Sequence, residues 1–517
     1  MRTKNSIINI SAGLGNQLII TLLSFVSRTV FINSLGIEYL GINGLLTNIF
    51  AMLALAEAGI GSSIMYSLYK PVAENDQQKI NVLMKLYRNA YLAIAIVILV
   101  LGLTLLPFLD LFIRDTSADN INVIYIIFLI NTVIPYLYLH KNSFLNVSQK
   151  GYIVTAVYSV SSIVSTVLKI AILYYTQNYI LFLLIESVIT ITTTIILASI
   201  VNRMYPFLKN KVVEKLDIET KQNIMRNVKA IVMQNIGVFL VFGTDNIIIS
   251  SFISVAAVGL YSNYVMLIDI CRTFINQIFN NIYHSVANLV AKENKEKIYN
   301  IYKVYYFLNF WLYSFFTIAL AVLIEPFILL WLGKEYLMGQ AVLIVLMIIF
   351  YERGMRNAIT TVKTTAGIFH EDRYAPLCQA AVNLIISIIL VKQIGIVGVF
   401  IGTMVSSLVV PFWTTPYLVY KKVFNKPLIE YFSKYFYFLC IGVCTYYVTS
   451  FISGFILLEN LLGLFLKGVI CLIIPNVVYT VIFYKTSECR YLYAILRNIM
   501  NSVVIKMKSG KVKLPVN

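Results

Sequence analysis

Apolar residues run along the chain in long stretches that short polar segments separate. A helix needs about 20 mostly apolar residues to cross the hydrocarbon core of a bilayer. Fourteen stretches are long enough, roughly residues 7–34, 40–66, 89–109, 121–139, 152–174, 179–201, 230–253, 257–289, 304–330, 341–362, 374–391, 396–419, 435–457 and 461–484. The pattern predicts an all-α polytopic membrane protein with fourteen transmembrane helices.

Composition supports this class. Of the 517 residues, 59% are hydrophobic and 12% are charged, whereas soluble domains are about 25% charged. The six cysteines and three histidines show none of the spacings typical of metal sites or disulfide frameworks. We therefore expect no metal, no cofactor and no disulfide.

The net charge of +18 is distributed unevenly. Lys and Arg gather at both ends of the chain and in every second loop, and cationic loops stay on the cytoplasmic side of a membrane. This pattern predicts that both termini are cytoplasmic. The excess charge would attract anionic lipid headgroups, so it does not indicate binding of nucleic acid.

Two pairs of segments suggest an internal repeat. "INSLGIEYLGINGLLTNI" resembles "ISSFISVAAVGLYSNYVMLI" with Gly41 aligned to Gly259, and "TQNYILFLLIESVIT" resembles "KQIGIVGVFIGTMVS" at nearly the same offset of about 217 residues. A duplicated six-helix unit in parallel orientation would explain both matches. The predicted organisation is an N-lobe (1–205), a cytoplasmic linker (206–229), a C-lobe (230–425), two further helices (426–485) and a basic cytoplasmic tail (486–517).

Polar residues inside the predicted spans mark a possible substrate path. Asn16 and Arg28 belong to a polar stripe along span 7–34, and Asn276 and Asn280 lie on a narrower polar face of span 257–289. Lipid cannot satisfy such groups, so they must face one another or water. The two stripes indicate a shared aqueous cavity.

The stretch "MIIFYERGMRNAITTVK" (347–363) adds cations to this picture. Arg353, Arg356 and Lys363 share one face of the helix at about 100° per residue, and Glu352 borders it. Such a row of cations suits a diphosphate or a carboxylated sugar, because guanidinium groups bind oxyanions in a bidentate manner. Two other readings stay open: one of the arginines pairs with Glu352, or Lys363 reaches the membrane surface.

Four acids within the spans are candidates for ion coupling, because ionisable groups inside a membrane are functional candidates by default. They are Asp245, Asp269, Glu57 and Glu186. A structural reading competes for two of them, since Asp269 can pair with Arg272 and Glu186 with Lys169. No phosphate-binding loop sequence is present, so an ion gradient or the membrane potential is the expected driving force.

Three segments carry a resemblance to a known family: "RTVFINSLGIEYLGINGLLTNI", "LALAEAGIGSSIMYSLYKP" and "TTAGIFHEDRYAPLCQAAVNLIISIILVKQIGIVGVFIGTMVS". They resemble the Wzx-type oligosaccharide-lipid flippases of the multidrug/oligosaccharidyl-lipid/polysaccharide exporter superfamily. The resemblance implies two six-helix lobes, a cationic central cavity and alternating access. It implies a bacterial cytoplasmic membrane protein, not an enzyme, that exports repeat units for capsule, O-antigen or exopolysaccharide.

The same resemblance implies an undecaprenyl-diphosphate-linked oligosaccharide as substrate, membrane lipids as neighbours, and a polysaccharide polymerase and a chain-length regulator as possible partners. Arg28 looks like the family's cavity cation, with Arg353 and Arg356 as companions. Asp245 departs from the expected pattern, because an acid would repel a diphosphate. Two alternatives remain: a cation-coupled multidrug antiporter of the same superfamily, and a flippase for lipid II or a teichoic acid precursor.

Overall fold

The computed structural model describes residues 2–57, 60–113, 116, 118–210, 222, 243–368, 371–494 and 497. Within these ranges the chain forms helices and no β-strand, which confirms the all-α class. It divides into two compact units: unit 1 comprises Met1–Asn263 and Pro376–Gly402, and unit 2 comprises Tyr264–Ala375 and Thr403–Asn517. The lobe boundaries expected from the sequence stay a prediction.

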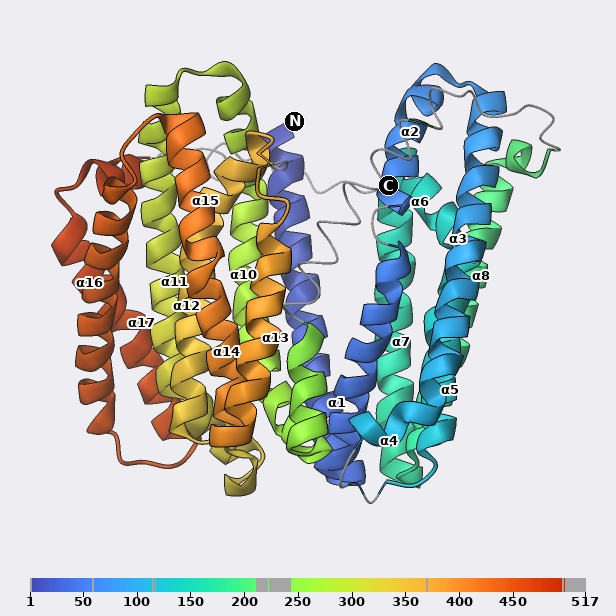
Figure 1. The fold of residues 1–517 in the computed structure, drawn as a ribbon, viewed down its shortest axis with the longest axis horizontal. Helices are drawn as coiled ribbons and strands as arrows, with labels where there is room; N and C mark the ends of the chain where they lie inside the picture. The colour runs from blue at the N-terminus through green and yellow to red at the C-terminus, as the bar shows by residue number, and fades with distance from the viewer. Residues whose placement is uncertain are drawn as a thin grey trace, which may run out of the picture. The chain divides into compact units, whose positions relative to one another are not determined.

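Unit 1 is built mainly from the N-terminal helices. They are α1 (Arg2–Leu53), η1 (Ala54–Glu57), α2 (Ile60–Glu74), α3 (Gln77–Leu105), η2 (Leu106–Phe108), α4 (Leu109–Phe112), α5 (Ile121–Tyr136), α6 (Leu139–Val147), α7 (Gly151–Thr176), α8 (Tyr179–Met204) and η3 (Pro206–Lys209). The unit also holds helical residues 243–252, the start of α10 (Val255–Lys292), α13 (Ala375–Ile394) and the first half of α14 (Ile396–Val409). Helix α8 packs against α5 and α7, and α7 also packs against α1 (Figure 1).

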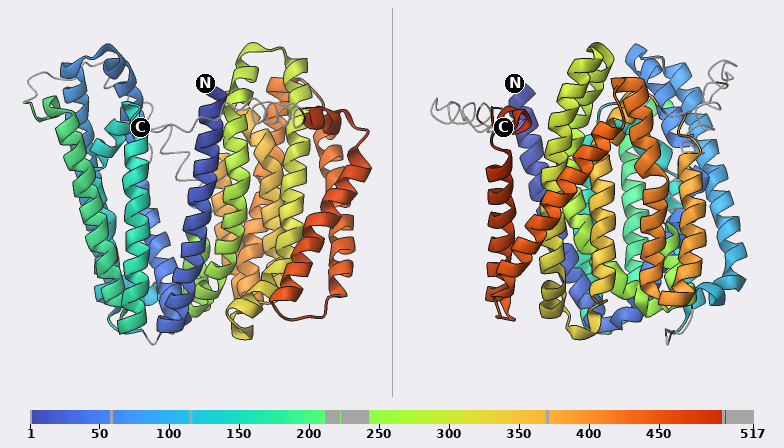
Figure 2. Two further views of the ribbon diagram at one scale, coloured as in Figure 1. Left: turned by 180° about the vertical axis from the view of Figure 1, so that it is seen from behind. Right: turned by 60° about the vertical axis from the view of Figure 1, so that its left-hand side comes forward.

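Unit 2 contains the rest of α10 and α14 together with the later helices. These are α11 (Lys295–Trp331), η4 (Lys334–Tyr336), α12 (Gln340–Thr365), α15 (Pro411–Val419), η5 (Tyr420–Phe424), α16 (Ile429–Gly454) and α17 (Leu461–Phe483). Helix α11 is the centre of this unit, because α12, α16 and α17 all pack against it (Figure 2).

The described residues include ten helices that are long and apolar enough to cross a membrane, or eleven if the bent pair α5 and α6 is one span. The predicted count of fourteen is therefore not confirmed. Three of the predicted spans account for the difference. Helix α1 joins the first predicted span to the start of the second across a kink at Gly36, and the predicted span 230–253 is described only from residue 243 onward. Helix α12, the predicted span 341–362, is not among the candidate spans.

Local sequence signals set several helix boundaries. The side chains of Asp76, Asn178, Asn294 and Asn460 each accept a hydrogen bond from a backbone N–H in the first turn of α3, α8, α11 and α17. These caps satisfy amide groups that have no partner within the helix. At Gly36 the backbone has φ 82°, a left-handed value that glycine adopts without strain, so α1 can change direction there.

Candidate functional site

Two glycines bring α1 and α10 into backbone contact within unit 1. A Cβ atom built on Gly41 would overlap the carbonyl oxygen of Val255, and one built on Gly259 would overlap the carbonyl oxygen of Ile37. Val255 and Gly259 lie 218 residues after Ile37 and Gly41, so the contact is reciprocal between repeat-related positions. The two glycines that match in the sequence thus lie at one helix crossing, and the close backbone contact explains why both positions require glycine.

Arg28 lies next to this crossing. Its Nη1 donates a hydrogen bond to Ser262 Oγ at 2.9 Å, and Ser262 Oγ donates to the carbonyl oxygen of Gly259 at 2.8 Å. Among the described residues, Arg28 has this hydroxyl as a partner and no carboxylate. A half-buried guanidinium in a spanning helix is therefore held in place without having its charge neutralised.

The repeat does not reproduce this contact. At the offset of 218 residues, Asn246 corresponds to Arg28 and Gly44 corresponds to Ser262. Asp245, which the sequence comparison set within one position of Arg28, is a buried residue of the helical segment 243–252. The cation and its hydroxyl partner belong to one side of the pseudo-symmetric crossing only.

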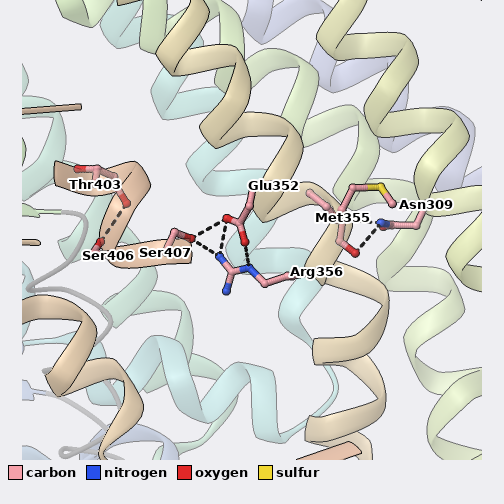
Figure 3. A network of polar contacts seen from close by, with 8 residues as sticks. Asn309, Glu352, Met355, Arg356, Thr403, Ser406 and Ser407 are labelled. Carbon is pink, nitrogen blue, oxygen red and sulfur yellow. Dashed lines mark hydrogen bonds and ion pairs between the residues drawn. The ribbon is translucent and has the colours of Figure 1, made fainter. Parts of the chain in front are cut away.

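The cationic face of α12 is organised differently. Arg356 donates through Nε to Glu352 Oε1, and its Nη2 donates to Glu352 Oε2 at 3.1 Å. The same Nη2 donates to Ser407 Oγ at 2.6 Å, and Ser407 Oγ donates to Glu352 Oε2 at 2.6 Å (Figure 3). The side chains of Glu352 and Arg356 are 3% and 13% exposed. This buried, closed triad neutralises Arg356.

Close packing surrounds the triad. Asn309 Nδ2 on α11 donates to the carbonyl oxygens of Gly354 and Met355 at 2.8 and 3.3 Å (Figure 3). A Cβ atom on Gly354 would overlap the Tyr313 ring, so the glycine in "YERGMR" lets α12 approach α11 closely. The polar stretch of α12 is thus a helix-packing surface.

The end of the cationic face is also paired. Lys363 forms an ion pair with Asp372, and Lys422 forms one with Glu371. Two ion pairs thus hold the turn between α12 and α13. Two of the three predicted ladder cations, Arg356 and Lys363, therefore have carboxylate partners. The alternative in which an arginine of α12 pairs with Glu352 is confirmed, and the arginine is Arg356.

The predicted ion-coupling acids have varied surroundings. Asp269 pairs with Arg272 at 2.5 Å, and Glu186 pairs with Lys169 at 2.9 Å, which confirms the structural alternative for both pairs. Glu57 accepts a hydrogen bond from the Tyr91 hydroxyl and also has Tyr136 as a phenol neighbour. The acid thus lies within a cluster of tyrosines from α3 and α5.

The structure says less about the three asparagines that were predicted to line the cavity. Asn276 is exposed on α10, whereas the side chains of Asn16 and Asn280 lie outside the described part of the chain. The sequence reasoning missed Ser407, Asp372 and Glu371, which complete the two charged clusters of unit 2. The charged segment "HEDR" marks Glu371 and Asp372 in the sequence as possible partners for cations. Ser407 is a single serine in an apolar span, and nothing in the sequence marks it.

Comparison with known proteins assigns the chain to a family. The model of the family described as polysaccharide biosynthesis protein matches residues 3–283, more than half of the chain. The chain belongs to the polysaccharide biosynthesis protein family. A comparison with curated protein sequences gave no match.

Solved structures show which fold this family member has. The lipid II flippase MurJ in an inward closed conformation is 16% identical, covers 92% of this chain and 99% of its own, and has a TM-score of 0.62. An inward-facing multidrug resistance MATE family transporter of the MOP superfamily is 14% identical, covers 78% and 97%, and scores 0.54. The Vibrio cholerae MATE transporter VcmN is 14% identical, covers 81% and 99%, and scores 0.52. This member of the polysaccharide biosynthesis protein family therefore shares the fold of these solved structures.

Proposed function

We propose that this protein is a flippase that moves undecaprenyl-diphosphate-linked oligosaccharide units across the bacterial cytoplasmic membrane by alternating access. Membership in a polysaccharide biosynthesis family and a fold shared with transporters and a lipid II flippase support the proposal. The exported units would serve capsule, O-antigen or exopolysaccharide synthesis, and a polymerase and a chain-length regulator would act next.

The observation that carries the proposal is the state of Arg28. A guanidinium inside a spanning helix costs free energy unless it has a functional or structural partner. Its partner here is the neutral hydroxyl of Ser262, so the cation keeps its charge and several N–H donors for an anion. A diphosphate fits those donors, because guanidinium groups bind phosphate oxygens in a bidentate manner.

The other predicted contact residues have different surroundings. Arg353, Arg356 and Lys363 are further proposed contacts, and Arg356 and Lys363 would have to leave carboxylate partners before binding a substrate. Asn16, Asn276 and Asn280 are proposed sugar contacts. For ion coupling, the proposed candidates stay Asp245, Glu57, Asp269 and Glu186, of which Asp269 and Glu186 would first have to leave their ion pairs.

The proposal is tested with purified full-length protein in lipid vesicles. A fluorescent undecaprenyl-diphosphate oligosaccharide is placed in both leaflets, and its accessibility to a membrane-impermeant quencher is followed over time. Arg28→Gln should lower the rate of translocation at subsaturating substrate by about tenfold or more, since a charged hydrogen bond is lost. Arg28→Lys should restore part of the rate, and Arg88→Gln, at an exposed arginine of α3, should not change it.

Two further substrates separate the alternatives. Lipid II in the same assay tests a peptidoglycan-precursor flippase, and uptake of a cationic dye driven by a proton or sodium gradient tests a multidrug antiporter. Translocation of dye without the oligosaccharide lipid would contradict the proposal. So would equal rates for the wild type and Arg28→Gln.

A further inference from the structure

A cavity of about 230 Å³ lies at one end of unit 2, where α11 ends and α17 begins. The turn between α16 and α17 lies at this same end of the unit (Figure 1). Apolar side chains form much of the cavity wall: Pro326, Leu329, Leu330, Leu337, Leu458 and Leu464.

Three charged side chains line the same cavity. Glu325 comes from α11, Glu459 from the turn before α17, and Lys467 from α17. The structure shows no ion pair within 4.0 Å for any of the three with another described residue, although the cavity holds charges of both signs. Elsewhere in unit 2, Lys363, Lys422 and Lys434 each have a carboxylate partner. Within the described residues, the two carboxylates and the ammonium of the cavity are therefore not paired with one another, and Glu325 has Gln340 as a hydrogen-bonding neighbour.

The position along the helices indicates the depth of the cavity. Helix α11 has 37 residues, about 55 Å at 1.5 Å per residue, so it is longer than the hydrocarbon core of about 30 Å. Trp331 ends this helix and Tyr336 follows it. Because tryptophan and tyrosine favour the boundary between lipid and water, this end of α11 lies at the level of the lipid headgroups.

The outer surface beside the cavity is apolar. Leu457, Leu461 and Phe465 are 86%, 78% and 66% exposed. In a membrane protein such side chains contact acyl chains. A molecule in the cavity would therefore have its charged part between Glu325, Glu459 and Lys467 and its hydrocarbon part along α17.

We propose that this cavity binds the headgroup of a zwitterionic phospholipid with a primary ammonium group, such as phosphatidylethanolamine. The ammonium lies between the carboxylates of Glu325 and Glu459, and the phosphate faces the ammonium of Lys467. A primary ammonium has three N–H donors for carboxylate oxygens, whereas the trimethylammonium of phosphatidylcholine has none. The site therefore selects between the two headgroups, and it does so independently of which substrate the protein transports.

The experiment uses the full-length protein in nanodiscs with equal amounts of phosphatidylethanolamine and phosphatidylcholine. Lipid that stays bound after extraction into detergent is measured by native mass spectrometry. The wild type should retain the ethanolamine lipid about tenfold over the choline lipid, since charged hydrogen bonds are at stake. In the double variant Glu325→Gln, Glu459→Gln the ratio should approach one, and in Lys467→Gln the retention of both lipids should fall.

The matched control is Glu296→Gln, at an exposed acid in the first turn of α11, which should keep the wild-type ratio. If the double variant does not fold, Glu459→Gln alone and Lys467→Gln carry the test, because Glu459 is exposed. A ratio near one in the wild type, or an unchanged ratio in the folded glutamine variants, would overturn the proposal. If Ca²⁺ alone stabilised the protein against thermal unfolding as much as the ethanolamine lipid does, the proposal would be overturned too, because the carboxylates would then form a cation site.

Discussion

Arg28 in unit 1 and Arg356 in unit 2 both lie in helices that consist mostly of apolar residues, yet their side chains have different partners. Arg28 donates to the hydroxyl of Ser262, whereas Arg356 is bound by the carboxylate of Glu352 and by Ser407. A hydroxyl orients a guanidinium, and a carboxylate also cancels its charge. The partner, not the residue type, therefore decides whether a cation in a membrane helix is available to an anionic ligand.

The largest expected effect comes from breaking the triad of unit 2. Arg356→Gln should lower the stability by roughly 3–5 kcal/mol, because it leaves the Glu352 carboxylate buried without its cation. The measurement is protein abundance in the membrane together with thermal unfolding in detergent.

The matched variants for this prediction are Arg28→Gln, which should keep normal abundance, and the double variant Glu352→Gln, Arg356→Gln, which should recover most of it. Normal abundance of Arg356→Gln alone would show that the triad is not a structural element, and the contrast between the two arginines would be lost.

A smaller effect is expected at the glycine crossing that supports Arg28. Gly41→Ala or Gly259→Ala should cost roughly 1–3 kcal/mol, because the new Cβ overlaps a backbone carbonyl that must move. Gly44→Ala is the control, since its Cβ would lie 3.6 Å from Val258 Cγ1, an ordinary contact. Thermal unfolding measures all three, and equal stabilities would show that the close approach of α1 and α10 is not required.

Removing the hydroxyl partner of Arg28 should have a still smaller effect. Ser262→Ala should cost about 1 kcal/mol, since one hydrogen bond to a half-buried charged group is lost. Ser407→Ala, in contrast, removes a hydroxyl from the triad of unit 2 but leaves the ion pair between Glu352 and Arg356 intact. Thermal unfolding measures both variants, and a loss from Ser262→Ala above that of Gly41→Ala would mean that Ser262, not the glycine crossing, holds α1 on α10.

The smallest effect is expected for the partly exposed pair Lys434 and Glu488, whose Nζ and Oε1 lie 3.5 Å apart. Burial acts to raise the pKa of Glu488, but its own backbone N–H, Ser487 and Lys434 outweigh it and hold the pKa below the ordinary value. The stabilisation is therefore present above the unfolded-state pKa of about 4.3 and is lost as the pH falls through the lower folded-state pKa.

Glu488→Gln should thus cost about 0.5 kcal/mol at about pH 7 and less at about pH 4. Thermal unfolding of wild type and variant at the two pH values checks this. A difference that grows as the pH falls would contradict the assigned direction of the pKa shift.

Features that depend on local chemistry can be predicted from the amino-acid sequence. Long apolar runs specify membrane helices, because their backbone groups must be satisfied internally. Asparagine and aspartate caps begin α3, α8, α11 and α17. The match of Gly41 with Gly259 was also visible, because repeat-related positions keep the same requirement for close backbone approach. The i,i+4 spacing of Glu352 and Arg356 showed that they could pair.

Which cations are neutralised depends on how the helices pack in three dimensions. Ser407 lies 51 residues after Arg356 and Ser262 lies 234 residues after Arg28, and no periodicity within a single helix brings such positions together. The same holds for Glu325 and Lys467, which helix packing places on one cavity. Charge availability depends on distances of a few ångströms between side chains of different helices, so a sequence can list the charged residues but their pairing is fixed by how the helices pack.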